Sequence, residues 1–265
     1  MKQLVPALII IGFTVFFGSC SRRDLFSSGR WIDLTHDFSS ETVYWPTADS
    51  FKLEEVSKGV TAKGFYYSAN NFSAAEHGGT HLDAPVHFAE GKLSVDMIPL
   101  SDLIAPAVVV DVSDKTMRNR DYQVSVSDFK KWENQHGKIP DGMILLINTG
   151  YAKFWPDREK YMGTAERGAG AVSELHFPGL DPKAAQWFVT ERSIKAIGLD
   201  TPSIDFGQSV LFESHQILFG ENIPVFENVA NIDKLPATGS FAMALPMKIK
   251  GGSGGPLRIV AFVPD

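Results

Sequence analysis

Residues 76–88 read Glu-His-Gly-Gly-Thr-His-Leu-Asp-Ala-Pro-Val-His-Phe, and they concentrate residue types that bind metals. Three of the seven histidines and one aspartate fall between His77 and His87. Neutral imidazole and carboxylate groups are ligands for divalent cations. A single histidine in a surface loop would need no special explanation, but three histidines and an aspartate at these offsets favour a metal site.

The spacing of these four side chains predicts a tight loop that leads into an extended run. The glycines between His77 and His81 are poor helix formers, and Pro85 follows soon after, so a helix is not expected here. His81 and Asp83 are two residues apart, and an extended backbone points both side chains to the same side. Pro85 favours extended backbone before it, and the chain is expected to continue in the same way to His87.

The composition of the chain limits the classes of protein to which it can belong. The chain has 265 residues, of which 44% are hydrophobic and 21% are charged, as in an ordinary globular protein of one large domain or two small ones. The formal net charge of −6 argues against nucleic acid as a partner, because binding to phosphates requires concentrated Lys and Arg.

The N-terminus has the features of an export signal. Met1-Lys2 supplies a positive start, and residues 4–17 are mostly apolar but too short for a comfortable membrane span. Small residues then precede Cys20, the only cysteine, in a pattern that resembles a bacterial lipoprotein signal whose cysteine is acylated. Acyl chains supply ~0.8 kcal/mol per buried CH₂ and would hold the protein at a membrane surface.

From this pattern we expect a lipid-anchored protein of the cell envelope, on the periplasmic or extracytoplasmic face of a membrane. Its expected parts are a lipoprotein signal peptide at 1–19, a tether at 20–30 and a folded domain at 31–265.

The remaining chain mixes segments typical of strands and of helices. Residues 107–112 and 143–148 are continuous apolar runs, the pattern of strands buried on both faces. Residues 151–170 suggest a long loop. Further strands are expected at 31–34, 65–72, 194–199, 223–226, 240–249 and 257–263, and further helices at 127–137, after 181 and at 210–219. This mixture indicates one α/β domain.

Two of the expected helices have start signals. Ser127-Asp128 can cap a helix that runs to Gly137, and Asp181 can cap a second helix with Pro182 at its first position. The glycine-rich residues 251–255 are expected to form a hairpin loop between the last two strands.

Three residues outside the histidine cluster are also candidates. His215 and Glu227 lie twelve apart, one on an expected helix and one at the end of an expected strand, so a connecting turn could bring both to one point. Taken alone, a half-exposed His on a helix and a surface Glu are the commoner interpretations of these two residues. Trp45 precedes a proline and is presented by extended backbone, with packing in the core and contact to a ligand both open.

Residues 31–265 resemble the cyclase family of metal-dependent hydrolases, the group that includes bacterial kynurenine formamidase and isatin hydrolase. Residues 77–88 match the family pattern H-x-G-T-H-x-D-x-P-x-H-F in full. The runs at 177–180 and 198–203 and the spacing of His215 and Glu227 also look like family positions. The resemblance implies a single α/β domain of the kynurenine formamidase-like swivelling β/β/α type, with a mixed sheet and flanking helices.

The resemblance also implies a role for each candidate residue. His77, His81 and Asp83 would hold one metal, and Asp83 would bridge to a second metal that His215 and Glu227 also hold.

The metals would be Zn or Mn, His87 would act as the proton shuttle and Trp45 would stack on the substrate. The family's W-P-G-D is replaced here by residues 45–49, Trp-Pro-Thr-Ala-Asp, which changes the turn beside the tryptophan. Homodimers or higher homo-oligomers are implied as well.

The chemistry of these residue types agrees with hydrolysis of an amide or lactam. Divalent metals lower the pKa of bound water to about 7 and polarise a carbonyl, while a histidine transfers protons near neutral pH. The expected substrate is a small aromatic acylamide or cyclic amide, such as N-formylkynurenine or an isatin-like lactam. Two alternatives stay open: lactone hydrolysis or cyclisation at the same metals, and a surface lipoprotein that binds metal without catalysis.

Overall fold

The computed structural model describes residues 26–265. The expected signal peptide and Cys20, the expected site of acylation, lie outside the described residues. Within the described part, no helix combines the length and the apolar character needed to cross a membrane. Strand β1 already begins at Gly29, and the Phe26 ring packs 5.1 Å from that of Phe262, so the folded part includes residues of the expected tether.

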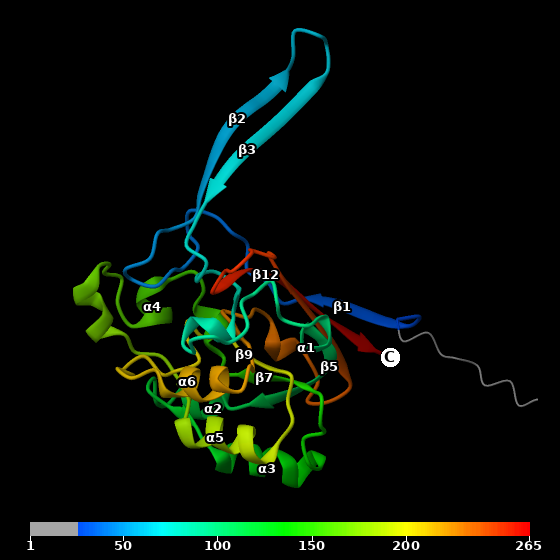
Figure 1. The fold of residues 1–265 in the computed structure, drawn as a ribbon, viewed down its shortest axis with the longest axis vertical. Coiled ribbons are helices and arrows are strands. Elements are labelled where there is room, and N and C mark those ends of the chain that lie inside the picture. Colours follow the sequence, from blue (N-terminus) through cyan, green and yellow to red (C-terminus); the bar gives the residue numbers. More distant parts are fainter. Residues whose placement is uncertain (1–25) are drawn as a thin grey trace, which may run out of the picture.

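An eight-stranded mixed sheet forms the centre of the molecule, in the order β1-β12-β11-β5-β7-β9-β10-β4 (Figure 1). Strand β4, at one end of this order, also pairs with β12, the second strand from the other end, so the sheet curls back on itself. Strands β5, β7, β9 and β10 are parallel to one another, and the other pairings are antiparallel. The strands are β1 (Gly29–Asp33), β4 (His81–Asp83), β5 (Ile104–Asp111), β7 (Ile144–Asn148), β9 (Ala196–Leu199), β10 (Val225–Glu227), β11 (Ser240–Pro246) and β12 (Gly254–Pro264).

Both faces of the parallel strands are buried, as their continuous apolar sequences predict. On β7, Leu146 packs into a core enclosed by the curled sheet, whereas its neighbours Leu145 and Ile147 pack into a second core against the helices. Ala107 and Val108 of β5 divide between the two cores in the same way. The predicted single α/β domain with a mixed sheet is confirmed.

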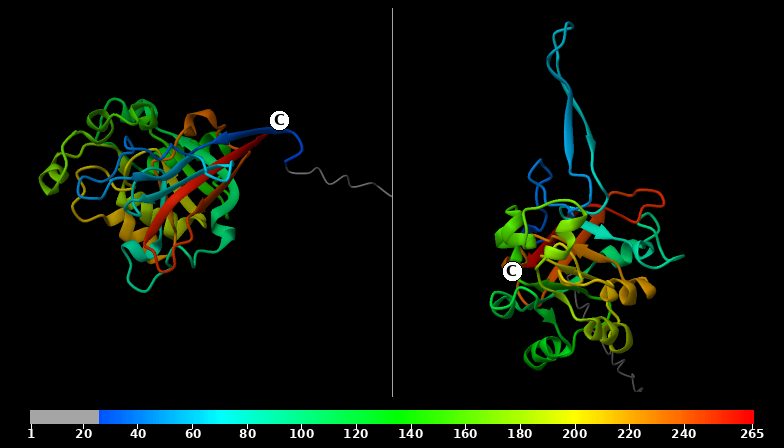
Figure 2. Two further views of the ribbon diagram at one scale, coloured as in Figure 1. Left: turned by 90° about the horizontal axis from the view of Figure 1, so that it is seen from above. Right: turned by 90° about the vertical axis from the view of Figure 1, so that its left-hand side faces the viewer.

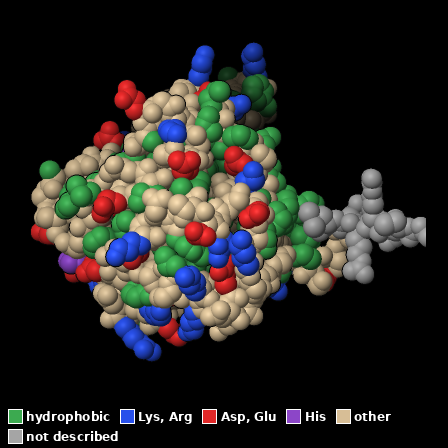
Figure 3. Space-filling model, turned by 60° about the horizontal axis from the view of Figure 1, so that its bottom comes forward, with side chains coloured by type: hydrophobic (Ala, Val, Ile, Leu, Met, Phe, Trp, Pro, Cys, Tyr) green, Lys and Arg blue, Asp and Glu red, His purple; other side chains and the backbone are tan. Residues whose placement is uncertain are grey.

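The longer helices cover one face of the sheet: α3 (Val126–His136), α5 (Pro182–Glu191) and α6 (Glu213–Gly220) (Figures 1 and 2). The predicted cap of α5 is confirmed, because the Asp181 side chain accepts a hydrogen bond from the Lys183 amide at 2.8 Å. On the face shown in Figure 3, Lys and Arg side chains are interspersed with Asp and Glu. The short helices and 3₁₀ turns are α1 (Leu100–Leu103), α2 (Ser113–Thr116), α4 (Arg158–Met162), η1 (Pro85–His87), η2 (Tyr151–Phe154), η3 (Ala169–Glu174) and η4 (Ile232–Lys234).

Three local predictions are wrong in detail. The N-cap of α3 is Ser125 and not Ser127, so the helix begins at Val126; the Asp128 side chain accepts a hydrogen bond from the Ser125 amide at 2.8 Å. Helix α6 starts at Glu213 and not at 210, because Phe212 has a left-handed backbone with φ of 51°. The segment 151–170 is not a long loop, since it contains η2, α4 and the start of η3.

Two small sheets lie outside the main one. Strands β6 (Gln123–Val124) and β8 (Gly179–Leu180) form a short parallel pair. Strands β2 (Lys52–Val60) and β3 (Tyr66–Ser73) form a hairpin that projects far from the body of the domain (Figure 1). The expected strand at 65–72 is confirmed as β3, but its partner β2 was not anticipated.

Candidate metal centre

The histidine cluster is built around β4, which lies between β10 and β12. Leu82, the middle residue of β4, points into the enclosed core, so His81 and Asp83 both point to the opposite side, as predicted. The register of the sheet pairs His81 directly with Glu227 on β10. Residues far apart in the sequence therefore become neighbours across one strand pairing.

Two glycines allow the loop before β4 to enter the site. Gly79 has φ of 59°, which disfavours other residues, and a Cβ atom there would lie 2.6 Å from the Phe38 ring. A Cβ atom on Gly78 would lie only 2.0 Å from the Tyr44 ring. The loop can therefore place His77 beside β4 only because its next two residues have no side chain.

The backbone after β4 departs from the prediction. Pro85–His87 form the 3₁₀ turn η1 and do not continue the extended run. Pro85 occupies the first helical position, where its missing N–H is no loss. The turn brings the His87 ring parallel to that of His77, with 3.8 Å between the ring centroids.

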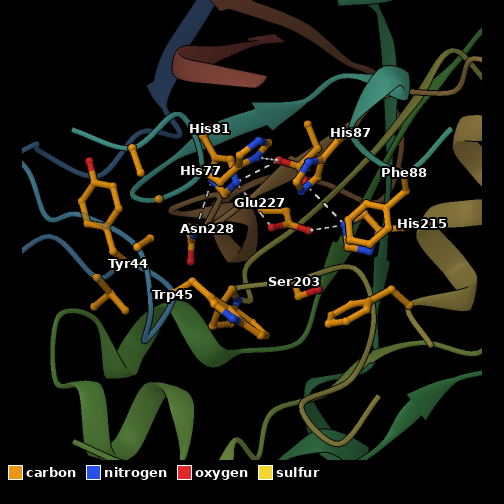
Figure 4. A pocket seen from close by; sticks show the side chains of 17 residues that line it. Tyr44, Trp45, His77, His81, His87, Phe88, Ser203, His215, Glu227 and Asn228 are labelled. Carbon is orange, nitrogen blue, oxygen red and sulfur yellow. Dashed lines mark hydrogen bonds and ion pairs between the residues drawn. The ribbon is translucent and has the colours of Figure 1, made fainter. Parts of the chain in front are cut away.

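Three histidines converge on two buried carboxylates (Figure 4). The Nδ1 atom of His77 is 2.7 Å from Asp83 Oδ1, and the Nε2 atom of His81 is 3.0 Å from the same oxygen. The Nε2 atom of His215 is 3.2 Å from Asp83 Oδ2 and 3.3 Å from Glu227 Oε1. The structure thus brings together all five predicted metal ligands.

The outward nitrogens of two of these histidines are fixed as hydrogen-bond donors. His81 Nδ1 is 2.9 Å from the Gly79 carbonyl oxygen, which can only accept. His215 Nδ1 is 2.6 Å from Oδ2 of the buried Asp205, which also accepts hydrogen bonds from the backbone amides of Ser214 and His215.

His77 is fixed in the same way by a longer chain of contacts. Its Nε2 atom is 2.8 Å from Ser253 Oγ, and that hydroxyl donates to Glu76 Oε2 at 2.7 Å. Ser253 then accepts from His77 Nε2–H. In their neutral form, all three imidazoles therefore direct the nitrogen without a ring proton toward Asp83 and Glu227.

These lone pairs face carboxylate oxygens at distances that require positive charge between them. His81 Nε2 is buried and has no hydrogen-bond partner among the described residues, although Asp83 Oδ1 lies 3.0 Å away. A divalent cation fits this arrangement, because imidazole nitrogens and carboxylate oxygens are its ordinary ligands.

The pKa values of the clustered histidines and carboxylates also indicate that positive charge is favoured at this site. Burial lowers the pKa of His81, but the Asp83 and Glu227 carboxylates overcome this and raise it to about 9. Burial also disfavours charge on His215, yet its carboxylate partners hold its pKa well above the ordinary value. Burial and the Asp83 charge together raise the pKa of Glu227. The positive charge that the carboxylates require can thus come either from protons on the histidines or from a bound cation.

Asp83 belongs to both groups of residues that could hold a metal. Ligand atoms of His81, Asp83 and Glu227 all lie within 4.8 Å of one another, and so do those of His77, Asp83 and His87. Asp83 is common to both groups, and one of them contains His87, the expected proton shuttle. The groups differ from the expected division, in which His77 and His81 share one metal.

His87 differs from the other histidines in its freedom. It is exposed toward the pocket, and neither ring nitrogen has a hydrogen-bond partner within residues 26–265. Partial burial of the ring lowers the pKa of His87 to about 4, although the negative charge of Asp83 acts in the opposite direction. A neutral imidazole with no fixed tautomer is suited to accept and return a proton.

A cavity of about 300 Å³ opens beside the candidate ligands. Trp45 and Ser203 lie across this cavity from the histidines (Figure 4). Phe88 and Phe212 supply further aromatic wall, with their ring centroids 5.3 Å apart. The mixture of aromatic walls and few polar groups suits a small, flat ligand.

Sequence reasoning missed the residues that orient the histidines. Asp205 and Glu76 showed no motif, and their roles depend on contacts made only after folding. Ser253 lies in the connection between β11 and β12. A hairpin loop was predicted at 251–255, but the connection spans residues 247–253, and Gly254 and Gly255 already belong to β12, where they pair with β4. The loop has the lettering G-x-S-x-G, but it leads into strand β12 and not into the helix of a nucleophile elbow.

Several known proteins are similar to this chain in sequence. The Cyclase family model matches residues 32–206. Isatin hydrolase from Roseibium aggregatum is 30% identical over 241 residues, covering 88% of this chain and 86% of that protein. A kynurenine formamidase from Bacillus cereus is 28% identical over 236 residues, covering 88% of this chain and 97% of that protein.

Solved structures show the same similarity in three dimensions. Isatin hydrolase A from Ralstonia solanacearum has a TM-score of 0.80 at 35% identity, covering 88% of this chain and 92% of that one. An isatin hydrolase bound to the product analogue thioisatinate also has a TM-score of 0.80, at 27% identity, covering 90% of this chain and 94% of that one.

Metal binding is expected to release protons at pH 7. Without a cation, His81 with a pKa of about 9 carries a proton on the nitrogen that a metal needs, so binding must displace it. Isothermal titration of metal-free protein with Zn²⁺ in two buffers of different ionisation enthalpy measures the release. The release should shrink as the pH rises past about 9. Equal binding enthalpies in both buffers at pH 7 would contradict the assignment.

Proposed function

The chain belongs to the cyclase family and is a metal-dependent hydrolase, and we propose that two divalent cations, Zn or Mn, serve its reaction. The proposed reaction is cleavage of the amide C–N bond in a small aromatic acylamide or cyclic amide. The observation that carries the proposal is the common orientation of His77, His81 and His215. Each directs a nitrogen lone pair at the carboxylates of Asp83 and Glu227.

His77, His81 and Asp83 would hold one cation, and Asp83, His215 and Glu227 would hold the other. The contacts of Ser253 and Asp205 keep two of these imidazoles in the tautomer that a metal requires. Cations held there would lower the pKa of a coordinated water to about 7 and would polarise the carbonyl of a substrate.

His87 would move the proton that hydrolysis transfers. The attacking water forms a bond to the carbonyl carbon, the C–N bond breaks, and the proton taken from the water ends on the leaving nitrogen. A neutral imidazole beside His77 can accept that proton first and then donate it. Because its ring nitrogens have no other partner in residues 26–265, His87 is free to change protonation state.

The cavity supports an aromatic substrate. Trp45 is half-buried in the cavity wall, and its ring lies 6.3 Å from that of Phe212, so a flat ring could contact both. The hydroxyl of Ser203 faces the same space and is available to a polar group of the substrate. Relatives named isatin hydrolase and kynurenine formamidase support N-formylkynurenine and isatin as the first compounds to test.

We also propose that the enzyme acts outside the cytoplasm, held to a membrane by acylated Cys20, and that it forms homodimers. The sequence pattern before Cys20 supports the anchor. Replacement of Cys20 by Ser should move the protein from the membrane fraction to the soluble fraction of cells. Membrane association unchanged by this substitution would contradict the anchor without affecting the chemistry.

Removal of the metals should abolish turnover. The purified protein would be treated with a chelator, dialysed and assayed on N-formylkynurenine and isatin before and after addition of Zn²⁺ or Mn²⁺. We expect activity to return as up to two metal equivalents per chain are bound. Metal binding without turnover of any amide, lactam or lactone would instead indicate a non-catalytic binding protein.

Substitution of His87 by Gln should separate proton transfer from metal binding. We expect kcat to fall by about 10²- to 10⁴-fold, the usual contribution of general acid–base catalysis, while metal content stays near that of the unchanged protein. His136→Gln, on an exposed residue at the end of α3, is the matched control and should leave both quantities unchanged. A loss of bound metal in the His87 variant would make His87 a ligand.

A further inference from the structure

One face of the main sheet lies outside the helix layer. In strands β1, β11 and β12, alternate side chains point into the enclosed core, among them Ile32, Ala242 and Ala261. Among the described residues, the second core, in which the long helices pack, includes no member of these three strands. The intervening side chains of β1, β11 and β12 therefore form an outer face that α3, α5 and α6 leave uncovered.

This outer face is aromatic at the end where the described chain begins. The register of the sheet places Trp31 of β1 and Phe241 of β11 on either side of Phe262 of β12. The ring of Phe26 lies 5.3 Å from that of Trp31 and 5.1 Å from that of Phe262. We call Phe26, Trp31, Phe241 and Phe262 the aromatic patch.

Part of the aromatic patch is open to solvent. Trp31 is 52% exposed and Phe26 is 41% exposed. In Figure 3, hydrophobic side chains gather at the margin of the molecule where the described chain begins. Trp31 also lies on β1, which is the edge strand at one end of the sheet order. Large apolar groups on an exposed edge strand promote aggregation unless something covers them, so the patch indicates a binding surface.

The charges of the outer face neutralise each other away from the patch. On β1, β11 and β12, the charged residues of this face are Asp33 and Arg258, and they form an ion pair with 2.6 Å between Oδ2 and Nη2. The side chains between this pair and the patch, Val260 and Met243, are apolar. An apolar phase could therefore contact the patch without burying an unpaired charge of this face.

The chain that precedes the patch decides which apolar phase lies nearby. Phe26 is six residues beyond Cys20 in the sequence. Even fully extended, six residues span at most about 20 Å. Acyl chains on Cys20 would insert in the bilayer, so the aromatic patch would have to remain within this distance of the membrane surface.

We propose that the aromatic patch docks on the lipid bilayer that acylated Cys20 enters, with Phe26 and Trp31 at the level of the headgroups. The inference rests on the lipid anchor proposed above and adds an orientation of the folded domain. Tryptophan is enriched at this level of membranes because its ring contacts acyl chains while its N–H stays hydrated. The tether raises the local concentration of the patch at the surface, so a small apolar contact is sufficient.

This orientation turns the catalytic side of the domain toward water. Helices α4 and α6 lie on the far side of the domain from the start of β1 (Figures 1 and 2). Phe212, in the wall of the substrate cavity, directly precedes α6. With the patch on the bilayer, a substrate would reach the cavity from the aqueous phase.

Quenching of tryptophan fluorescence by brominated lipids tests the proposal. The acylated mature chain would be reconstituted into phosphatidylcholine vesicles that carry bromine either near the headgroup or near the end of the acyl chains. We expect stronger quenching by bromine near the headgroup, because the ring of Trp31 lies at the interface. Trp31→Phe should remove most of this quenching, since it deletes the fluorophore and keeps an aromatic side chain in the patch.

Trp187→Phe is the matched control, because Trp187 lies on α5 and packs in the second core. It should leave quenching by brominated lipid unchanged. The intact mass of the purified chain reports acylation separately. An unacylated Cys20 would overturn the anchor and the docking together, without affecting the metal centre.

The remaining outcomes separate the docking from the anchor. An acylated chain in which brominated lipid does not quench Trp31 would overturn the docking and leave the anchor standing. If acrylamide in the aqueous phase also failed to quench Trp31 in that chain, a protein surface would cover the patch in place of the bilayer. Equal loss of lipid quenching in Trp31→Phe and Trp187→Phe would likewise contradict docking through the aromatic patch.

Discussion

Two buried carboxylates, Asp83 and Glu227, impose the constraint on which the site depends. Negative charge removed from water is costly unless positive charge lies close to it. Three imidazoles surround these carboxylates with their lone pairs pointing inward. The imidazoles can therefore supply positive charge only by taking up protons or by sharing a cation. The raised pKa of His81 and the low pKa of Asp83 correspond to the state in which the histidines are protonated. The geometry is equally suited to the second, which is the state that a hydrolase needs.

The sheet makes this arrangement rigid. Strand β4 is paired on both sides, and Leu82 anchors it in the enclosed core, so the positions of His81 and Asp83 are set by backbone hydrogen bonds. Glu227 is held by the same ladder. His215 comes from a helix, and there the buried Asp205 replaces the sheet as the source of orientation. Metal ligands on regular elements with fixed partners are well placed before any ligand arrives.

The walls of the cavity are built from less regular parts of the chain than the candidate ligands. Trp45, Ser203 and Phe212 come from loops and turns, where sequence can change without disturbing the strands beneath. Phe212 adopts its left-handed conformation at the start of α6, only three residues before His215. Three of the candidate ligands, His81, Asp83 and Glu227, lie on strands, whereas the wall residues lie on loops and turns. We therefore expect the altered turn after Trp45 to affect the substrate more than the metals.

The sequence by itself determined the histidine and aspartate cluster at 77–87, the extended path of His81 and Asp83, and the buried parallel strands, because these depend on residue type and short-range periodicity. His215 and Glu227 became candidate ligands only through the resemblance to a family. It also contained the cap of α5. Only the tertiary structure decided that Glu227 pairs with His81, that Asp205 and Ser253 fix the tautomers, and that β2 and β3 form a projecting arm. These features depend on strand register and on contacts between distant segments. No local pattern encodes such contacts, since they arise when the sheet closes.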